Sequence, residues 1–373
     1  MPDTGQTTSY TPTIGEDADF TMNAPGYIIN GDGTVTDTVT GLQWQQTDGG
    51  EMTVENAIAY CDTLTCGGFT DWRLPDCHEL FSILHHDKAN PAINTTYFTL
   101  TAAEYWWSSQ RQANDNTKVW CTNAGGGVGN HPKAETISAG GTKKFHVRAV
   151  RDVIPPQTVQ VHFINNGDGT IKDMLTNLTW LSVPAQDSMT WEQALIYSDT
   201  LTTAAQNDWR LPNIKELQSI NDESKINPSM DQAYFTNSKP AQYWSSTTLP
   251  NQTAKAWYLD TRFGITTYAN KTAQLLLLCV RGDGKETTDI LEDDFQPDWF
   301  YVYPNPANSA IRIYLNQKVD NVQITNSNGD LVFQTIPSGK EVVFEPKSSG
   351  IMLVSVFQGN KVAYKQVAVL NGR

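Results

Sequence analysis

The sequence predicts an α+β protein in which one module occurs twice in tandem and an all-β sandwich follows. Motifs recur at a nearly constant offset, each copy mixes helix-type and strand-type patterns, and the last part of the chain alternates between apolar and polar residues. The chain has 373 residues, which is more than one hydrophobic core usually covers. We therefore expect several domains.

The two copies share short motifs at matching positions. They are N-G-D-G-T at 30–34 and 166–170, D-W-R-L-P at 71–75 and 208–212, W-S-S at 107–109 and 244–246, and a closing V-R at 150–151 and 280–281. The offset is 136 at the first motif (168 minus 32), 137 at the second (209 minus 72) and 130 at the last (280 minus 150). The second copy therefore lacks seven residues (137 minus 130) relative to the Gly-rich stretch 125–141 of the first copy, which predicts a loop of variable length there.

Each copy is predicted to open with a β-hairpin and to continue with two helices. The N-G-D-G-T block contains the Asn-Gly and Asp-Gly pairs that favour a two-residue turn. Apolar residues of 54–64 fall on one helical face, and the equivalent segment starts with a capping box of Thr190 and Gln193. Asp76 and Asn213 are expected to be the N-caps of a second short helix. The rest of each copy is predicted to form short strands and loops.

The part that follows the second copy has a different composition. Acidic residues dominate a segment that is predicted to be a solvated linker, and six short alternating runs beyond it predict a sandwich. The predicted organisation is an N-terminal extension at 1–26, module one at 27–152, a linker at 153–160, module two at 161–282, an acidic linker at 283–299 and the sandwich at 300–373.

Charge and hydropathy exclude some classes of partner. The formal net charge of -14 repels phosphate backbones and anionic membranes, so nucleic acid is not expected as a partner. No apolar run is long enough for a membrane span. No secretory signal follows Met1, which taken alone favours a cytosolic protein or a trimmed chain.

With these motifs in place, each copy resembles the C-terminal domain of Legionella collagen-like adhesins. That pattern joins N-G-D-G-T, T-G-L-x-W, W-R-L-P-x-x-x-E-L, Y-W-S-S and a final V-R. The family is similar in fold to C-type lectins and, more distantly, to formylglycine-generating enzymes, so the resemblance implies two tandem C-type-lectin-like modules. The repeated aromatic and basic residues are expected in the module cores: Trp44, Trp72, Arg73, Trp107, Trp180, Trp209, Arg210 and Trp244.

Residues 301–370 resemble the C-terminal sorting domain of the type IX secretion system. The resemblance rests on Tyr303-Pro304-Asn305-Pro306 at the start, on Gly329 in the middle and on Gly350 before a strand. It implies an immunoglobulin-like sandwich, a partner in the secretion machinery, and residence outside the cell or on the surface of a Gram-negative bacterium of the Bacteroidota type. It also argues against the cytosolic location that the start of the chain, taken alone, favours.

The chain departs from the adhesin family in its cysteines. The family commonly has a disulfide between the first helix and the position before the closing V-R. The first copy has Cys61 but Ala149 at these two positions, and the second copy has Ser198 and Cys279. Because each copy keeps one partner, the usual bridge cannot form, and Cys279 is expected to be unpaired. Substitute disulfides in an exported module would be Cys61 with Cys66, or Cys77 with Cys121.

Aromatic and basic residues in the divergent late loops of the first copy are the candidate ligand contacts. They are Trp106, Arg111, Trp120, His131, Lys133, Lys143 and Lys144. The alternative is that these loop lysines are simply solvated. Asp32 and Asp168 are interpreted as turn residues rather than calcium ligands, because no further acidic residues recur at calcium-loop spacing. Neither a metal nor a cofactor is expected.

The leading hypothesis is a non-catalytic surface adhesin whose modules bind a glycan or an extracellular matrix polymer. The alternative is a structural subunit of a surface layer or fibre that self-associates through its modules. An exported enzyme of the formylglycine-generating type is a remote third hypothesis, because no cysteine pair recurs at matched positions and no Ser/His/Asp or paired-carboxylate signature stands out.

Overall fold

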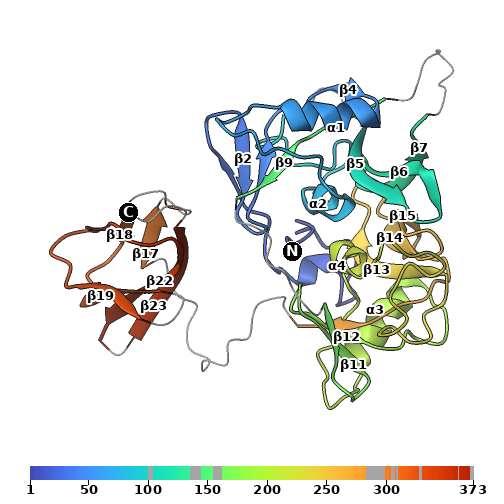
Figure 1. Ribbon diagram of the computed structural model, residues 1–373. Coiled ribbons are helices and arrows are strands. Elements are labelled where there is room, and N and C mark those ends of the chain that lie inside the picture. Colours follow the sequence, from blue (N-terminus) through green and yellow to red (C-terminus); the bar gives the residue numbers. More distant parts are fainter. Residues whose placement is uncertain are drawn as a thin grey trace. The chain divides into compact units, whose positions relative to one another are not determined.

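The computed structural model describes most of the chain in two compact units. The first unit contains both repeats, with residues 1–152 and 156–286, and the second contains residues 287–373 with 153–155 (Figure 1). The described residues are 1–99, 104–134, 144–153, 162–282, 299–303, 307, 310–326, 330–359 and 361–369. The expected linkers therefore lie, apart from Val153 and Trp299, outside the described residues.

The first unit is mainly β with a few short helices. A 3-10 helix, η1 (Asp17–Asp19), precedes the first repeat. The first repeat consists of β1 (Tyr27–Ile29), β2 (Thr34–Asp37), β3 (Leu42–Gln45), β4 (Glu51–Met52), α1 (Val54–Thr63), α2 (Cys77–Ser82), β5 (Tyr105–Gln112), β6 (Asp115–Asn123), β7 (Val128–Pro132), β8 (Phe145–His146) and β9 (Val150–Asp152). The second consists of β10 (Phe163–Asn165), β11 (Thr170–Asp173), β12 (Thr179–Leu181), α3 (Trp191–Thr200), α4 (Ile214–Ser219), β13 (Gln242–Thr248), β14 (Lys255–Asp260), β15 (Ile265–Asn270) and β16 (Val280–Arg281). Among the described residues, every helix is too short or too polar to cross a membrane.

The helices begin where the side chains of the sequence cap them. Thr190 and Gln193 form the expected capping box at α3, and Asp76 forms one with Glu79 at α2. Asn213 does the same at α4. Each cap satisfies backbone N–H groups that have no partner inside the helix, which fixes the start of a helix only six residues long.

The N-G-D-G-T hairpins form, but not with the expected two-residue turn. Strands β1 and β2 are last paired at Ile29 and Val35, and the Asn30 N–H donates to the carbonyl of Thr34 at 3.0 Å. The Asp32 carboxylate accepts from the backbone N–H of Thr34 at 3.0 Å and from its hydroxyl at 2.6 Å. The loop is longer than two residues because the Asp32 carboxylate binds the Thr34 N–H and hydroxyl within the turn.

One sheet joins the two repeats. Each repeat has a four-stranded sheet of its own, in the orders β1-β2-β3-β9 and β10-β11-β12-β16. The third sheet has eight strands in the order β13-β14-β15-β7-β6-β5-β8-β4, and β15 pairs with β7 through Thr266 and Val128 (Figure 1). The two repeats therefore share backbone pairing as well as a core.

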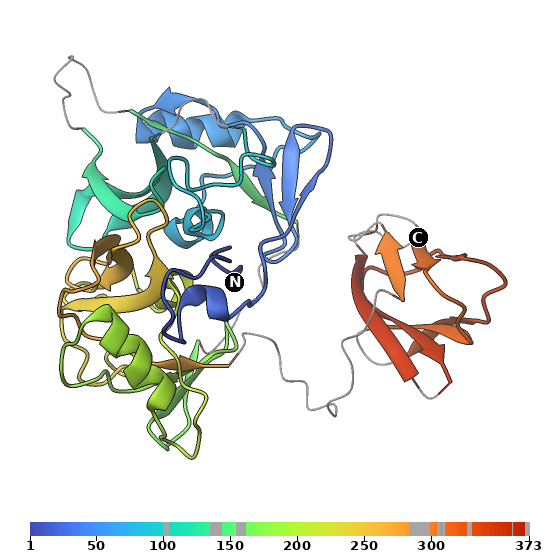
Figure 2. The ribbon, with the colours of Figure 1, turned by 180° about the vertical axis from the view of Figure 1, so that it is seen from behind.

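Residues 1–26, expected to be an extension, are packed into the first unit. The N-terminal segment lies against the second repeat in Figure 2, where it is drawn in dark blue. Glu16 and Asp17 are 0% and 2% exposed. Burial raises the pKa of the Asp17 carboxyl well above its ordinary value, and the hydroxyls of Thr247 and Thr4 donate to it.

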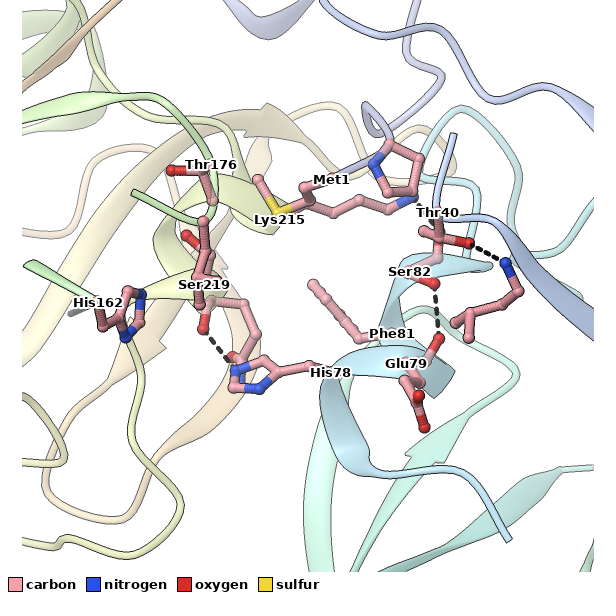
Figure 3. A pocket seen from close by; sticks show the side chains of 14 residues that line it. Met1, Thr40, His78, Glu79, Phe81, Ser82, His162, Thr176, Lys215 and Ser219 are labelled. Carbon is pink, nitrogen blue, oxygen red and sulfur yellow. Dashed lines mark hydrogen bonds between the residues drawn. The ribbon is translucent and has the colours of Figure 1, made fainter. Parts of the chain in front are cut away.

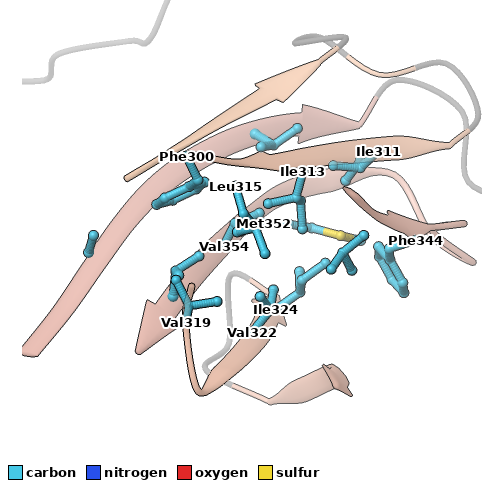
Figure 4. Packing of buried hydrophobic residues seen from close by; sticks show 14 of the residues in the cluster. Phe300, Ile311, Ile313, Leu315, Val319, Val322, Ile324, Phe344, Met352 and Val354 are labelled. Atoms are coloured by element: carbon cyan, nitrogen blue, oxygen red, sulfur yellow. The ribbon is translucent and has the colours of Figure 1, made fainter. Parts of the chain in front are cut away.

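The second unit is built from two antiparallel sheets that share one hydrophobic cluster. Its strands are β17 (Phe300–Tyr303), β18 (Ile311–Leu315), β19 (Asn321–Asn326), β20 (Leu331–Thr335), β21 (Glu341–Phe344), β22 (Gly350–Gln358) and β23 (Lys361–Val369). The sheet orders are β17-β18-β21 and β20-β19-β22-β23. Inward residues such as Ile313, Val322 and Val354 are 0% exposed and form the shared core (Figure 4). Gly350 has a positive φ of 131° at the start of β22, while Pro304, Asn305, Pro306 and Gly329 lie outside the described residues.

Candidate functional site

The junction of the two repeats has a hydrophobic centre of its own. Trp120 and Trp257, which are equivalent at the offset of 137 (257 minus 120), are 0% and 2% exposed in one buried cluster. Phe81 of α2 and Ile214 of α4 belong to the same cluster. Because this cluster takes side chains from both repeats, neither repeat can bury it alone.

Helices α2 and α4 hold each other through reciprocal polar contacts. The Lys215 ammonium of α4 donates to the carbonyl of Ser82 at the end of α2, at 2.7 Å. At the equivalent position of α2, the His78 ring nitrogen Nε2 lies 3.0 Å from the carbonyl of Gln218 in α4. Each contact satisfies a carbonyl in the last turn of the opposite helix.

A cavity of about 250 Å³ lies between these helices, with Phe81 pointing into it between Met1 and His78 (Figure 3). Burial lowers the pKa of Lys215 to about 8, although nearby carboxylates oppose the shift. The same ammonium also donates to the carbonyl of Asp3 at 2.8 Å. Lys215 and His78 thus have structural partners across the two helices, and we assign the cavity to the assembly of the unit.

A more open groove lies over the strand pair β7 and β15. One cavity of about 600 Å³ is lined by Gln112, Asn114, Asn130, Thr267 and Phe263 among others. A second cavity of about 430 Å³ is lined by Asn90, Glu104, Tyr105, Trp257 and Tyr268 among others. The two cavities share Asn123, Thr266 and Thr267, and we call them together the junction groove.

The glycines of the first repeat shape this groove. The Asn123 side-chain oxygen accepts from the backbone N–H of Gly125 at 2.9 Å and of Gly127 at 3.2 Å, which holds the turn between β6 and β7. A Cβ at Gly127 would come within 2.8 Å of the Thr266 carbonyl oxygen. Glycine is therefore required there so that β7 and β15 can approach each other.

The groove is not repeated in the second copy. At the offset of 137, Asn123 corresponds to Asp260 and Gly125 to Arg262. The Arg262 side chain pairs with Asp260, its Nε donating to Oδ1 at 2.8 Å. A charged pair therefore stands where the first repeat has an amide and open space.

The groove offers several amide side chains beside aromatic rings, together with the charged Glu104, Asp115 and Lys118. Its amides can both donate and accept hydrogen bonds, and Phe263 and Tyr268 are 49% and 39% exposed. The one lysine in the larger cavity, Lys118, lies 3.6 Å from the Asp115 carboxylate. Among the described residues, no three His, Cys or acidic side chains come together as a metal-binding group.

The structure corrects two of the candidate ligand contacts. Trp106 is 2% exposed and packs in the core of the first repeat, while Trp120 lies in the core between the repeats. Neither ring can contact a ligand, because both faces are covered by other side chains. In strand β5 the two adjacent tryptophans, Trp106 and Trp107, are buried on opposite faces of the sheet.

The other candidates are exposed or half-buried where the structure describes them. Arg111 and Lys144 are exposed, and the Lys133 ammonium lies 3.1 Å from the Glu55 carboxylate. The half-buried His131 ring packs against Tyr105 and Phe145 at centroid distances of 5.2 and 5.1 Å. Lys143 lies outside the described residues. Arg111 and His131 flank Val119 across β5, β6 and β7, and Glu55 lies near both Lys133 and Arg111, so these three candidates share one side of the sheet without Trp106 or Trp120.

The repeated tryptophans and Arg210 lie inside the modules as expected, whereas the Arg73 side chain is partly exposed. Trp44, Trp107, Trp180 and Trp244 are 0% exposed, and Trp72 and Trp209 are 3% and 2% exposed. The Arg210 guanidinium pairs with the Glu216 carboxylate at 2.6 Å, and Arg73 makes the equivalent pair with Glu79 at 2.6 Å. Both arginines therefore hold the second helix of their repeat.

The substitute disulfides are not formed. Cys61, Cys66 and Cys77 are free thiols, so neither the Cys61–Cys66 nor the Cys77–Cys121 bridge exists in this structure. Cys61 is buried against the sheet, whereas the Cys66 thiol faces the carbonyl of Gly33 at 3.6 Å. Cys279 is also free, and the Ser198 hydroxyl lies 3.5 Å from its sulfur.

Sequence reasoning missed the residues that line the junction groove. Asn90, Asn123, Phe263 and Tyr268 carry no motif, and two of them come from the second repeat. The signal that could have found them is the Gly-rich stretch after Asn123, where the two copies differ in length.

Comparison with known proteins identifies the parts of the chain. The Lcl C-terminal domain family matches residues 33–151 and 169–281, and the secretion system C-terminal sorting domain family matches residues 301–370. A comparison with curated proteins gave no match.

Among solved structures, the chain is similar to PorZ, a surface component of the type IX secretion system of Porphyromonas gingivalis. The identity is 16%, and the match covers 70% of this chain and 30% of PorZ, so the chain spans under a third of that protein. The TM-score of 0.18 is too low to support any argument about the fold.

The two Lcl matches cover more than half of the chain and coincide with the two repeats of the first unit. The chain therefore belongs to the Lcl C-terminal domain family, with two such domains in tandem and a type IX secretion C-terminal sorting domain that directs it to the cell surface or beyond.

Proposed function

We propose that this secreted protein is a non-catalytic surface adhesin that binds an uncharged polysaccharide in the junction groove. The observation that carries the proposal is the groove itself, which combines amide side chains with exposed aromatic rings across two adjoining cavities. Sugars present hydroxyls to such amides and C–H faces to such rings. Cavity volumes of about 430 and 600 Å³ lie in the range of small-molecule sites and leave room for several sugar units.

Charge favours a neutral ligand. The chain carries -14, and the one lysine of the larger cavity is next to a carboxylate. A sulfated polymer would meet repulsion from the Glu104 and Asp115 carboxylates in the lining of the groove. The resemblance to C-type lectins supports a C-type-lectin-like fold for the modules, and the resemblance to type IX sorting domains supports an immunoglobulin-like fold for the sandwich. Lectin folds commonly present ligand sites on their loops.

The test fills the groove with the residue that the second repeat already carries. Gly125 lies on the groove and its φ is not in the positive range, so Gly125→Arg adds bulk there; its Cβ would lie 3.0 Å from the Asn123 side-chain oxygen, which has to shift slightly. The full chain would be screened on an array of neutral, amino and sulfated glycans. We expect hits among neutral polysaccharides, loss of the signal in Gly125→Arg, and roughly tenfold weaker binding in Phe263→Ser.

The matched control is Gly339→Arg, because a side chain at Gly339 of the sorting unit would meet nothing within 4 Å. It should bind as the unmodified chain does. Absence of any glycan hit, together with filaments of the secreted protein in electron micrographs, would reject the adhesin and support the structural subunit. Binding that survives Gly125→Arg would place the ligand elsewhere.

A further inference from the structure

The N-terminal segment covers one particular face of the second repeat. That face consists of Arg210, Asn213, Ser246, Thr247 and Thr248, and all five are at most 6% exposed. The segment reaches it with acidic and amide side chains.

Four hydrogen bonds fix the segment on this face. The Asn213 amide donates to the Asp3 carboxylate at 2.9 Å, and the Thr247 hydroxyl donates to Asp17 at 2.6 Å. The Gln6 side chain accepts from the Thr248 N–H at 3.0 Å and donates to the Thr248 carbonyl at 2.9 Å. An extended peptide with carboxylates is therefore the kind of ligand that this fold accommodates here.

The equivalent face of the first repeat has the same scaffold, and none of the described residues covers it in this way. At the offset of 137 its members are Arg73, Asp76, Ser109, Gln110 and Arg111, which we call the open face. The backbone N–H that opens α2 donates to the Gln110 side chain at 2.9 Å, just as the N–H that opens α4 donates to the Thr247 hydroxyl at 2.9 Å. The two faces thus have matching local geometry.

Exposure separates the two faces. The side chain of Arg73 is 38% exposed, against 7% for Arg210. Ser109 and Arg111 are exposed, whereas their counterparts Ser246 and Thr248 are 1% and 0% exposed. The exposed fractions are lower in the second repeat because the N-terminal segment covers this face there.

We propose that the open face docks an extended acidic segment of a partner protein. The reason for a carboxylate is the exposed Arg111, which stands in place of Thr248 beside the Gln110 amide in place of Thr247. Asp76 stands in place of the amide donor Asn213, so the carboxylates of the segment lie at the Arg111 end of the face and not at the Asp3 position. A carboxylate on the partner takes the position that Asp17 and its neighbours take on the second repeat, and it gains a charge-assisted hydrogen bond from Arg111. This site is separate from the junction groove and does not depend on glycan binding.

The probe for the test is a synthetic peptide with the sequence of residues 1–22, together with a panel in which each of its positions is replaced by acidic, neutral and basic residues. Binding to the full chain would be measured by fluorescence anisotropy. We expect acidic members of the panel to bind with one peptide per chain. Arg111→Glu should weaken them by roughly tenfold or more and should shift the preference toward basic members.

Two further variants keep the result specific. Ser109→Trp fills the open face and should abolish binding, while Asn116→Trp, equally exposed on β6 but outside the face, should leave it unchanged. Gly125→Arg in the groove should also leave peptide binding unchanged. The proposal is overturned if no member of the panel binds, or if binding persists in both Arg111→Glu and Ser109→Trp, which would indicate exchange with the segment on the second repeat.

Discussion

At the position where the second repeat has Leu278, the first repeat carries the fully buried Arg148. Its guanidinium donates to the carbonyls of Gln45, Gln46 and Thr99 at 2.7, 2.7 and 2.9 Å. Burial lowers the pKa of this guanidinium to about 10, and the nearby Asp48 carboxylate opposes the shift. The two repeats thus fill one core position with opposite chemistries, a network of hydrogen bonds and an apolar side chain.

This contrast gives a prediction for Arg148→Leu, which introduces the residue of the other repeat. Three buried carbonyls lose their donor, and Asp48 loses its nearby cation, so the free energy of unfolding should fall by roughly 3 to 5 kcal/mol. Urea denaturation followed by tryptophan fluorescence measures it. The control Leu278→Met should cost less than about 1.5 kcal/mol. A loss in Arg148→Leu no larger than in that control would contradict the assignment.

His86 makes stability depend on acid. Its ring is 1% exposed, and Nε2 lies 3.0 Å from the carbonyl of Gly126. Burial lowers the pKa of His86 to about 3, with the Lys215 charge adding to the effect. Because the folded-state pKa lies below the unfolded value, the unfolded chain binds more protons between about pH 6.5 and 3, and stability falls as the pH falls through that window.

We therefore expect His86→Gln to flatten the decline of the free energy of unfolding between pH 6.5 and 4. The measurement is a series of urea curves at stepped pH values for both proteins. His162→Gln serves as a control, because that side chain is 39% exposed. Parallel pH profiles for His86→Gln and the unmodified chain would show that another group causes the acid sensitivity.

Among the elements, the pairing of β7 with β15 depends on a glycine. Gly127→Ala would place a Cβ at 2.8 Å from the carbonyl of Thr266, and a backbone atom cannot give way cheaply. We expect a loss of roughly 1 to 3 kcal/mol in the stability of the first unit, measured by thermal unfolding. Gly129 lies two residues further on, in β7. A Cβ in Gly129→Ala would meet nothing within 4 Å, so the substitution should change stability by less than about 0.5 kcal/mol. Equal effects of the two substitutions would argue against tight contact between the strands.

The elements that the sequence predicted are those with local signals. The caps at Asp76, Thr190 and Asn213 lie where the sequence placed them, because a cap is a contact between residues three apart. The pairing of Val128 with Thr266 could not be predicted, because no local pattern encodes which strands meet across a repeat. The hairpin turn was wrong in detail because the Asp32 side chain competes with the backbone for hydrogen bonds.

On the scale of the whole molecule, the two repeats form one folding unit. They share a sheet, a hydrophobic cluster and the N-terminal segment, whose Gln6 side chain donates to carbonyls of both His86 and Thr248. Differential scanning calorimetry should therefore show two unfolding transitions, one for the repeats together and one for the sorting unit. Three separate transitions would contradict this. Deletion of residues 1–20 should lower the first transition and leave the second unchanged.

The same scale explains why the candidate site was only half predicted. The sequence pointed to the late part of the first repeat, and the Gly-rich turn there does border the groove. The specific candidates were chosen for residue type, however, and Trp106 and Trp120 turned out to be core residues. Phe263 and Tyr268 were not chosen, because they become groove residues only when the second repeat packs beside the first.

By itself the sequence determined the duplication, the sorting tail, the helix starts and the alternation of the sandwich strands, because each of these is written in residues close together along the chain. Only the tertiary structure decided that the repeats join through β7 and β15, that the N-terminal segment covers one face of the second repeat, and that neither expected disulfide forms. The physical reason is that contacts between distant segments depend on which surfaces meet after each repeat has folded. The periodicity of the sequence is the same in both repeats, and it carries no information about which surfaces of the two repeats contact each other.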